Sequence, residues 1–238
     1  MVDQDNKKLA VLIDADNAQA VVCSELLAEI AIYGTANIKR AYGDWTTTNL
    51  KSWKDYLLKH AIQPIQQFSY TIGKNATDSS MIIDAMDLLH DQKLDGFCIV
   101  SSDSDFTRLA TRIREEGLVV YGFGEKKTPK PFVSACDKFT YTEVLRRSKN
   151  NSEVTKQVDT DLKEILIMAI RAVSKEDGWA PLSGVGGYIN KNYPSFDSRN
   201  YDYDKLGQLI KSVDYLDVDE QASSAGSQVI HIYIKLKK

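Results

Sequence analysis

The chain has 238 residues, 43% of them hydrophobic and 26% charged, with a net charge of −3. This composition is typical of a globular protein, and the negative balance argues against wrapping of nucleic acid by bulk positive charge, although a local basic face stays open. The three cysteines and three histidines stand apart from one another. Their spacing argues against a histidine-built zinc site and predicts reduced core thiols in a cytoplasmic protein. No apolar run is long enough to cross a membrane, so no membrane contact is expected.

In the first half of the chain, short apolar segments alternate with amphipathic ones. This alternation predicts an α/β fold with a mostly parallel sheet flanked by helices, in which ligands bind beyond the carboxyl ends of the strands. Pro64 has no amide hydrogen, which places the third strand near an edge. Strands are expected over 9–17, 37–45, 62–70, 96–103 and 118–124, helices over 18–34, 46–61, 77–92 and 105–117, and a closing segment over 130–145.

The second half has a different pattern. Residues 146–159 are polar and nearly free of apolar side chains, which predicts a linker between a domain at 1–145 and another at 160–238. Three helices and a strand pair are typical of a small winged-helix domain. The helices are expected over 160–178, 181–194 and 203–213, and the strands on either side of a Ser/Gly turn within 215–238.

Acidic residues gather where two predicted strands end. Asp14 and Asp16 follow the first strand, and Asp103 and Asp105 follow the fourth. Asp78 opens a helix and shares one face of it with apolar side chains only, so it lies where this helix meets the sheet. Like charges brought to one rim require a counterion, and oxygen ligands suit a hard cation such as Mg²⁺ or Mn²⁺.

Each of these acids also has a simpler interpretation. Asp is a common N-cap and is favoured in the first helical turn. Asp103 could cap the helix that begins near Asp105, and Asp78 could follow a cap at Thr77. The metal interpretation depends on three separate segments that deliver carboxylates to one rim, rather than on any single acid.

An acid-bound divalent cation suits phosphate chemistry, because it lowers the pKa of bound water and neutralises phosphate charge. Lys74, four residues before Asp78, could hold a phosphate, steady the carboxylates or be an ordinary solvated lysine. A third hypothesis makes "DADN" an aspartyl-phosphate site with Asp14 as nucleophile and Asp16 as general acid. It is weaker, because such sites usually have Thr or Val where this chain has Asn17.

Three blocks in order resemble the NYN family, a PIN-like nuclease fold that includes the LabA-like proteins. The blocks are "LIDADNA" (12–18), "KNATDSSMIIDAMDLL" (74–89) and "IVSSDSDFTRLATRIREEGLVVYGFG" (99–124), within a match over residues 8 to about 145. The resemblance implies a ribonuclease dependent on Mg²⁺ or Mn²⁺. It implies that the metal-binding acids are Asp14, Asp78 and Asp103, and that Asp105 acts beside them in catalysis. The supporting residues would be Asn17, Lys74, Asp84 and Ser102.

The C-terminal segment resembles the LOTUS domain, also called OST-HTH. This resemblance implies a winged helix that binds RNA or a protein partner. The family commonly has Gly where this chain has Asp202. Four tyrosines could stack on bases or pack the small core: Tyr188, Tyr193, Tyr201 and Tyr203. The candidate RNA-binding side chains are Lys191 and Lys205 in this domain and Lys39, Arg40, Arg108 and Arg112 in the first.

Together these features predict a metal-dependent endoribonuclease whose winged-helix module directs it to RNA. The alternative is a non-catalytic RNA-binding regulatory adaptor that keeps the fold and some of the acids. A homodimer is compatible with either hypothesis.

Overall fold

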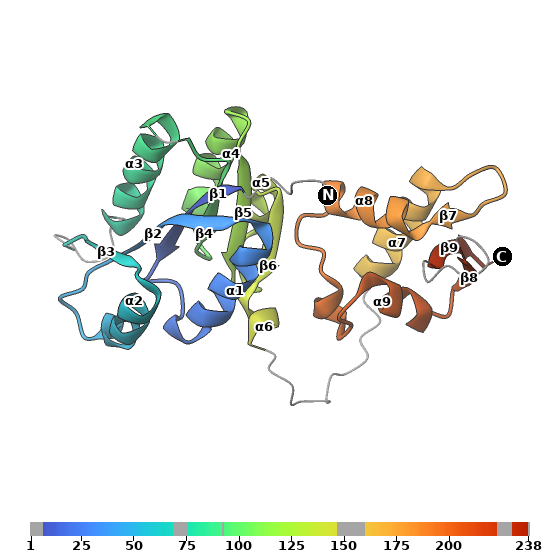
Figure 1. The fold of residues 1–238 in the computed structure, drawn as a ribbon, viewed down its shortest axis with the longest axis horizontal. Helices are drawn as coiled ribbons and strands as arrows, with labels where there is room; N and C mark the ends of the chain where they lie inside the picture. Colours follow the sequence, from blue (N-terminus) through green and yellow to red (C-terminus); the bar gives the residue numbers. More distant parts are fainter. Residues whose placement is uncertain (1–6, 69–75, 92, 147–159, 223–229, 238) are drawn as a thin grey trace. The chain divides into compact units, whose positions relative to one another are not determined.

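The computed structural model describes residues 7–68, 76–91, 93–146, 160–222 and 230–237. The chain divides into two compact units, Met1–Lys149 and Asn150–Lys238 (Figure 1). The expected linker over 146–159 lies outside the described residues except for Arg146. Within the described ranges, no helix combines the length and the apolar character that crossing a membrane requires.

The first unit contains a six-stranded sheet in which every pairing is parallel, and this confirms the predicted fold class. The strand order is β3-β2-β1-β4-β5-β6. Pro64 lies in the edge strand β3, as its missing amide hydrogen predicts. The strands are β1 (Lys8–Asp14), β2 (Thr35–Gly43), β3 (Gln63–Gln66), β4 (Gly96–Val100), β5 (Val119–Gly124) and β6 (Lys138–Tyr141).

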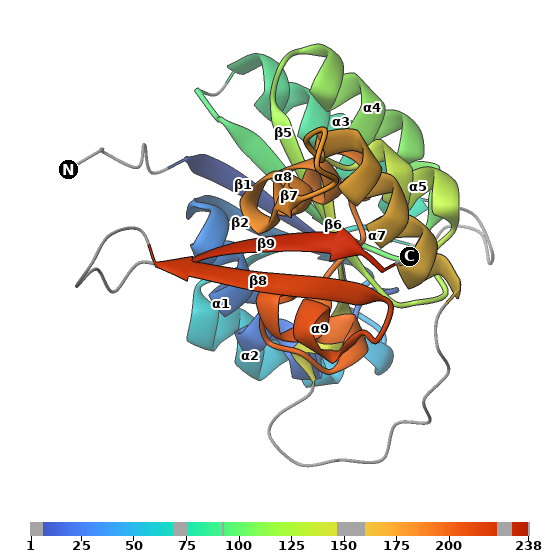
Figure 2. The same ribbon diagram turned by 90° about the vertical axis from the view of Figure 1, so that its right-hand side faces the viewer.

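Helices cover both faces of this sheet (Figures 1 and 2). One face carries the 3-10 turns η1 (Ala20–Val22) and η2 (Asn49–Trp53) and the helices α1 (Cys23–Tyr33), α2 (Lys54–His60) and α6 (Thr142–Leu145). The other carries α3 (Ala76–Asp91), η3 (Ser104–Phe106), α4 (Thr107–Glu115) and α5 (Lys130–Ala135). All three cysteines are free and buried in these two layers, as predicted.

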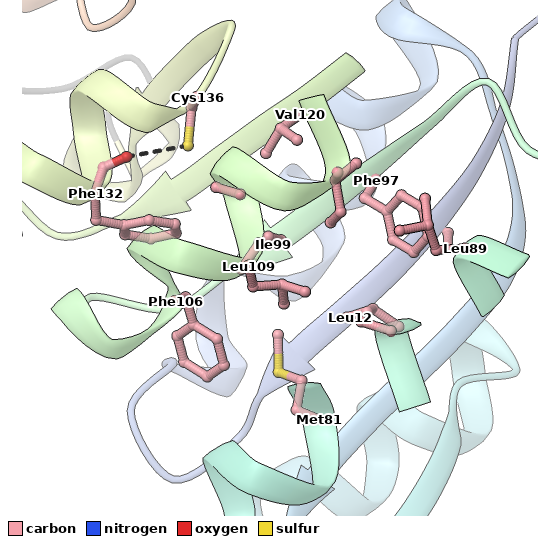
Figure 3. Packing of buried hydrophobic residues seen from close by; sticks show 14 of the residues in the cluster. Leu12, Met81, Leu89, Phe97, Ile99, Phe106, Leu109, Val120, Phe132 and Cys136 are labelled. Carbon is pink, nitrogen blue, oxygen red and sulfur yellow. Dashed lines mark hydrogen bonds between the residues drawn. The ribbon is translucent and has the colours of Figure 1, made fainter. Parts of the chain in front are cut away.

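Successive residues of the central strands pack into opposite layers, because side chains alternate across a strand. Leu12 of β1 and Ile99 of β4 face α3 and α4, where they meet Met81 and Leu109 (Figure 3). Ile13 packs into the opposite layer with α1 and α2. The same alternation directs the next side chain of β1, an aspartate, toward the face that α3 covers.

The chain changes direction at β1. It first moves outward from β1 to β2 and β3, and then returns through α3 to place β4 on the other side of β1. In open α/β sheets this reversal leaves a crevice at the carboxyl ends of the two central strands, where ligands bind. Ile13 pairs with Val100 at the end of the β1–β4 ladder. The residues that follow, Asp14 and Ser101, are therefore neighbours at the crevice.

The second unit is a small domain of helices and an antiparallel sheet of order β7-β9-β8, which confirms the predicted architecture (Figure 2). All four of its candidate tyrosines are partly buried against its core, as the packing interpretation required. Asp202 adopts a left-handed conformation, with φ of 69°, at the position where the family commonly has Gly. The elements are α7 (Thr160–Val173), β7 (Ala180–Pro181), α8 (Leu182–Asn192), η4 (Ser198–Tyr201), α9 (Leu206–Ser212), β8 (Leu216–Ala222) and β9 (Ile230–Leu236).

Candidate metal centre

Three carboxylates meet at the crevice. One oxygen from each of Asp78, Asp103 and Asp105 lies within 4.8 Å of the other two. Asp78, in the first turn of α3, is only 8% exposed, whereas Asp103 is partly exposed and Asp105 is exposed. The cluster therefore has a buried side against the protein and an open side toward solvent. Oxygen donors in this arrangement can hold a hard divalent cation.

Asp14 lies beside this cluster and is completely buried. Its Oδ2 accepts hydrogen bonds from Asn17 Nδ2 at 2.8 Å and from Ser101 Oγ at 2.7 Å, and its Oδ1 accepts the Asn17 amide at 3.3 Å. Burial raises the pKa of Asp14, although these hydrogen bonds act in the opposite direction. The carboxylate is thus held in one orientation by donors from two segments of the chain.

Ser101 connects the two groups of acids. Its hydroxyl donates to Asp14 and accepts the backbone amide of Asp103 at 3.1 Å. The side chain of Asp103 in turn accepts the Asp105 amide at 2.9 Å and caps η3. Asp103 is therefore both a cap and a member of the cluster, because one carboxylate oxygen can cap the turn while the group faces Asp78.

The charge at Asp78 is unfavourable in the absence of a cation. Burial, together with the nearby carboxylates of Asp14, Asp103, Asp105 and Asp16, raises the pKa of Asp78 to about 6. Such a shift, caused by desolvation and by like charges, is characteristic of functional carboxylate sites.

Two residues at this site were not singled out from the sequence for what they do in the structure. Thr77 Oγ1 donates to Asp16 Oδ2 at 2.9 Å, which ties the start of α3 to the loop after β1. Ser101, buried at 1% exposure, forms the bridge between Asp14 and Asp103. A signal for Ser101 did exist, because it is the first polar residue after the apolar run of β4, as Asp14 is after the apolar run of β1.

The supporting residues proposed from the resemblance have different surroundings. Asn17 bonds Asp14, whereas Ser102 Oγ accepts the Glu125 amide at 2.8 Å. Asp84, on α3, forms an ion pair with Arg40 and accepts the hydroxyl of Tyr42, both on β2. These bonds anchor α3 to the sheet and do not bring Asp84 into the three-carboxylate cluster. Lys74 lies outside the described residues.

The candidate RNA-binding side chains of the first unit already have partners. Lys39 Nζ donates to the His60 carbonyl and Arg40 pairs with Asp84. On α4, Arg112 pairs with Glu115 and Glu116, whereas Arg108 is 83% exposed and lies 4.0 Å from Glu115. An ion pair this long and exposed contributes little, so the Arg108 guanidinium is only weakly held by Glu115. In the second unit, Lys191 and Lys205 are exposed.

Comparison with known families identifies both units. The NYN domain model matches residues 8–145, more than half of the chain, and the OST-HTH/LOTUS domain model matches residues 153–227. The chain therefore belongs to the NYN domain family and carries an OST-HTH/LOTUS domain after the NYN domain. Both predicted resemblances are confirmed. Membership in this PIN-like nuclease family, with the acidic cluster, implies nucleic-acid binding.

Several solved structures are similar to parts of the chain. A crystal structure of a protein of unknown function from Vibrio parahaemolyticus is 18% identical, with a TM-score of 0.49, over 58% of this chain and 94% of that one. A solution structure of an uncharacterized protein from Nitrosomonas europaea is 32% identical over 39% of this chain and 87% of its own, with a TM-score of 0.31. A solution structure of a Chromobacterium violaceum protein is 40% identical over 34% and 84%, with a TM-score of 0.26. No curated protein matches the chain.

Proposed function

We propose that the NYN domain is a Mg²⁺- or Mn²⁺-dependent endoribonuclease and that the OST-HTH/LOTUS domain directs it to RNA. The observation that carries this proposal is the meeting of three carboxylates within 4.8 Å at the crevice between β1 and β4. Family membership supplies the reaction class.

In this proposal Asp78, Asp103 and Asp105 hold the cation. When bound, the ion lowers the pKa of a water molecule and neutralises charge on the scissile phosphate. Asp14 orients the site from its buried side. Its oxygens are fixed by Asn17 and Ser101, and Ser101 also accepts the amide of Asp103. The sequence had placed Asp14 among the ligands and Asp105 outside them. The proposal gives Asp105 a ligand role because it belongs to the three-carboxylate cluster, and it gives Asp14 an orienting role because its oxygens already accept hydrogen bonds from Asn17 and Ser101.

The RNA reaches the site from the open side, where Asp105 is exposed. Arg108 lies in the first turn of α4, three residues beyond Asp105, and is exposed enough to contact a phosphate next to the scissile one. Lys191 and Lys205 would contact RNA held by the second domain. The net charge of −3 means that these contacts have to be local, because bulk attraction does not support them.

The test uses labelled single-stranded and structured RNA with Mn²⁺, with EDTA, and with the Asp103→Asn protein. We expect internal cleavage in Mn²⁺ and its loss in EDTA and in Asp103→Asn, while circular dichroism stays unchanged. Asp87→Asn is the matched control, since it removes one exposed carboxylate from α3 outside the cluster. Undiminished cleavage in EDTA would contradict the metal mechanism. RNA binding without a metal-dependent product would favour the non-catalytic adaptor.

A further inference from the structure

A cavity of about 640 Å³ lies next to Asp16, the acid that follows Asp14 and Ala15 in the loop after β1. It opens between the loop after β1, where Asp16 and Gln19 line it, and the loop and turn after β2, where Asp44, Leu50 and Trp53 line it. Both loops leave the carboxyl ends of neighbouring strands, so the cavity shares a rim with the candidate metal centre. Its volume is that of a small-molecule site, roughly 300–1,000 Å³.

The chemistry of the lining excludes phosphate. Two carboxylates line this cavity, and no lysine or arginine is among its described lining residues. A phosphodiester would be repelled here and would remain at the cation. The deep side is apolar, because Leu50 and Trp53 are 4% and 2% exposed. A flat group with an apolar body and N–H donors on its edge satisfies both sides, which describes a nucleobase.

Asp16 is the acid positioned to recognise such an edge. The Asp44 carboxylate is used by its own loop and by β3, because Oδ1 accepts the amide and hydroxyl of Thr46 and the side-chain amide of Gln66. Asp16 is exposed, and its Oδ2 accepts Thr77 Oγ1. This bond fixes the Asp16 carboxylate relative to α3, the helix that carries Asp78 of the metal cluster. A base held by Asp16 would therefore have a defined distance from the cation.

Gly43, the last residue of β2, makes this arrangement fit. A Cβ at Gly43 would lie 2.5 Å from Leu50 Cδ1 and 3.3 Å from Asp16 Oδ1. Any side chain here would displace the apolar wall and crowd the carboxylate. The end of β2 thus provides the room in which Leu50 and Asp16 approach each other.

We infer that this cavity binds a nucleobase of the RNA substrate through Asp16, with guanine the best fit. Guanine presents its N1–H and 2-amino group side by side, and one carboxylate can accept both, whereas uracil offers one N–H between two acceptors. The inference depends on the proposed ribonuclease function. It adds a base preference at one position beside the cleaved bond.

The experiment compares short single-stranded oligouridines in which one position at a time carries guanosine, inosine or uridine. Cleavage is measured in Mn²⁺, and binding is measured separately in EDTA by fluorescence anisotropy. At one position we expect guanosine to be preferred over uridine by about tenfold, and inosine, which lacks the 2-amino group, to lose most of that gain. The test depends on the ratio between guanosine and uridine at that position and not on the absolute cleavage rate.

Two variants and a control test the assignment. Asp16→Asn replaces one of the two acceptor oxygens with an NH₂ donor. Ser52→Trp places a large ring in the cavity from an exposed lining position. Both should abolish the guanosine preference. Asp55→Asn removes a nearby exposed carboxylate that does not line the cavity and should keep it. Equal use of guanosine and uridine at every position, or a guanosine preference that survives in either variant, would overturn the inference.

The two proposals can fail separately. If no RNA is cleaved in Mn²⁺, the ribonuclease proposal fails, and the anisotropy data still decide about the cavity. A guanosine preference in binding that Asp16→Asn and Ser52→Trp remove would then support a base-reading RNA adaptor. Binding that is indifferent to the base would overturn the cavity assignment as well.

Discussion

Replacing Asp78 with asparagine should stabilise the metal-free protein near neutral pH. The pKa of Asp78 rises from 3.8 to about 6 on folding, mainly because of burial. The folded state therefore binds this proton more tightly than the unfolded state, so the carboxylate lowers stability as pH rises through 6. This difference in pKa lowers the free energy of unfolding by about 3 kcal/mol at pH 7.5 and by only about 1 kcal/mol at pH 4.5. Asparagine is similar in shape and has no charge, so it removes this penalty.

The assay is urea unfolding in EDTA at the two pH values. The free energy of unfolding of Asp78→Asn should exceed that of the wild type by up to about 3 kcal/mol at pH 7.5, and by about 2 kcal/mol less at pH 4.5. Asp87→Asn, on the exposed side of the same helix, should leave stability within about 0.5 kcal/mol of wild type at both.

Adding Mn²⁺ should reverse the order. A cation that binds the folded wild type stabilises it by mass action, whereas the asparagine variant has lost a ligand and should gain much less. If Asp78→Asn proved less stable than wild type in EDTA at pH 7.5, the idea of an uncompensated buried charge would be refuted. If Mn²⁺ stabilised both proteins equally, Asp78 would not be a ligand.

Three further substitutions test other parts of the structure. Ala61 is the exposed C-cap of α2 and has a left-handed conformation with φ of 49°, so Ala61→Gly should stabilise the protein by about 1 kcal/mol in thermal or urea unfolding. Ala31→Gly, inside α1, should destabilise it by up to about 1 kcal/mol. Asp84→Ala leaves Arg40 and Tyr42 without their common partner and should cost about 1–3 kcal/mol in urea unfolding while Mn²⁺ still stabilises the protein; lost Mn²⁺ binding would argue that Asp84 belongs to the metal site. Ser101→Ala removes the link between Asp14 and Asp103 and should weaken Mn²⁺ binding about 10- to 100-fold by calorimetry; an equal loss in Ser102→Ala would show that the link is not the cause.

Much of the fold is predictable because it depends on patterns along the chain. The alternation of apolar strands and amphipathic helices indicates a parallel sheet, and Asp14 and Asp103 can be placed at its rim because each comes soon after a strand. The two-residue strand β7 has no such signal. It exists only because Ala180 pairs with Ile234 of β9, a contact that no local pattern reveals.

The detailed site depends on contacts between distant segments. Ser101 bonds Asp14 across 87 positions of the chain, and Thr77 bonds Asp16 across 61. Which carboxylates come within reach of one cation follows from these bonds and from the rotation of α3 against the sheet. Asp84 illustrates the limit, because family pattern groups it with the acids, whereas that rotation directs it to Arg40.

The insertion of β4 beside β1 also sets the order in which the domain can be assembled. Strands β1 to β3 pair with near neighbours in sequence, but β4 has to close a long loop before it pairs with β1, and such non-local pairing is slow. A partly synthesised chain that ends before β4 has Asp14 and Asp78 without Asp103 and Asp105. In the proposed nuclease, such a chain would therefore lack two of the three carboxylates that hold the cation.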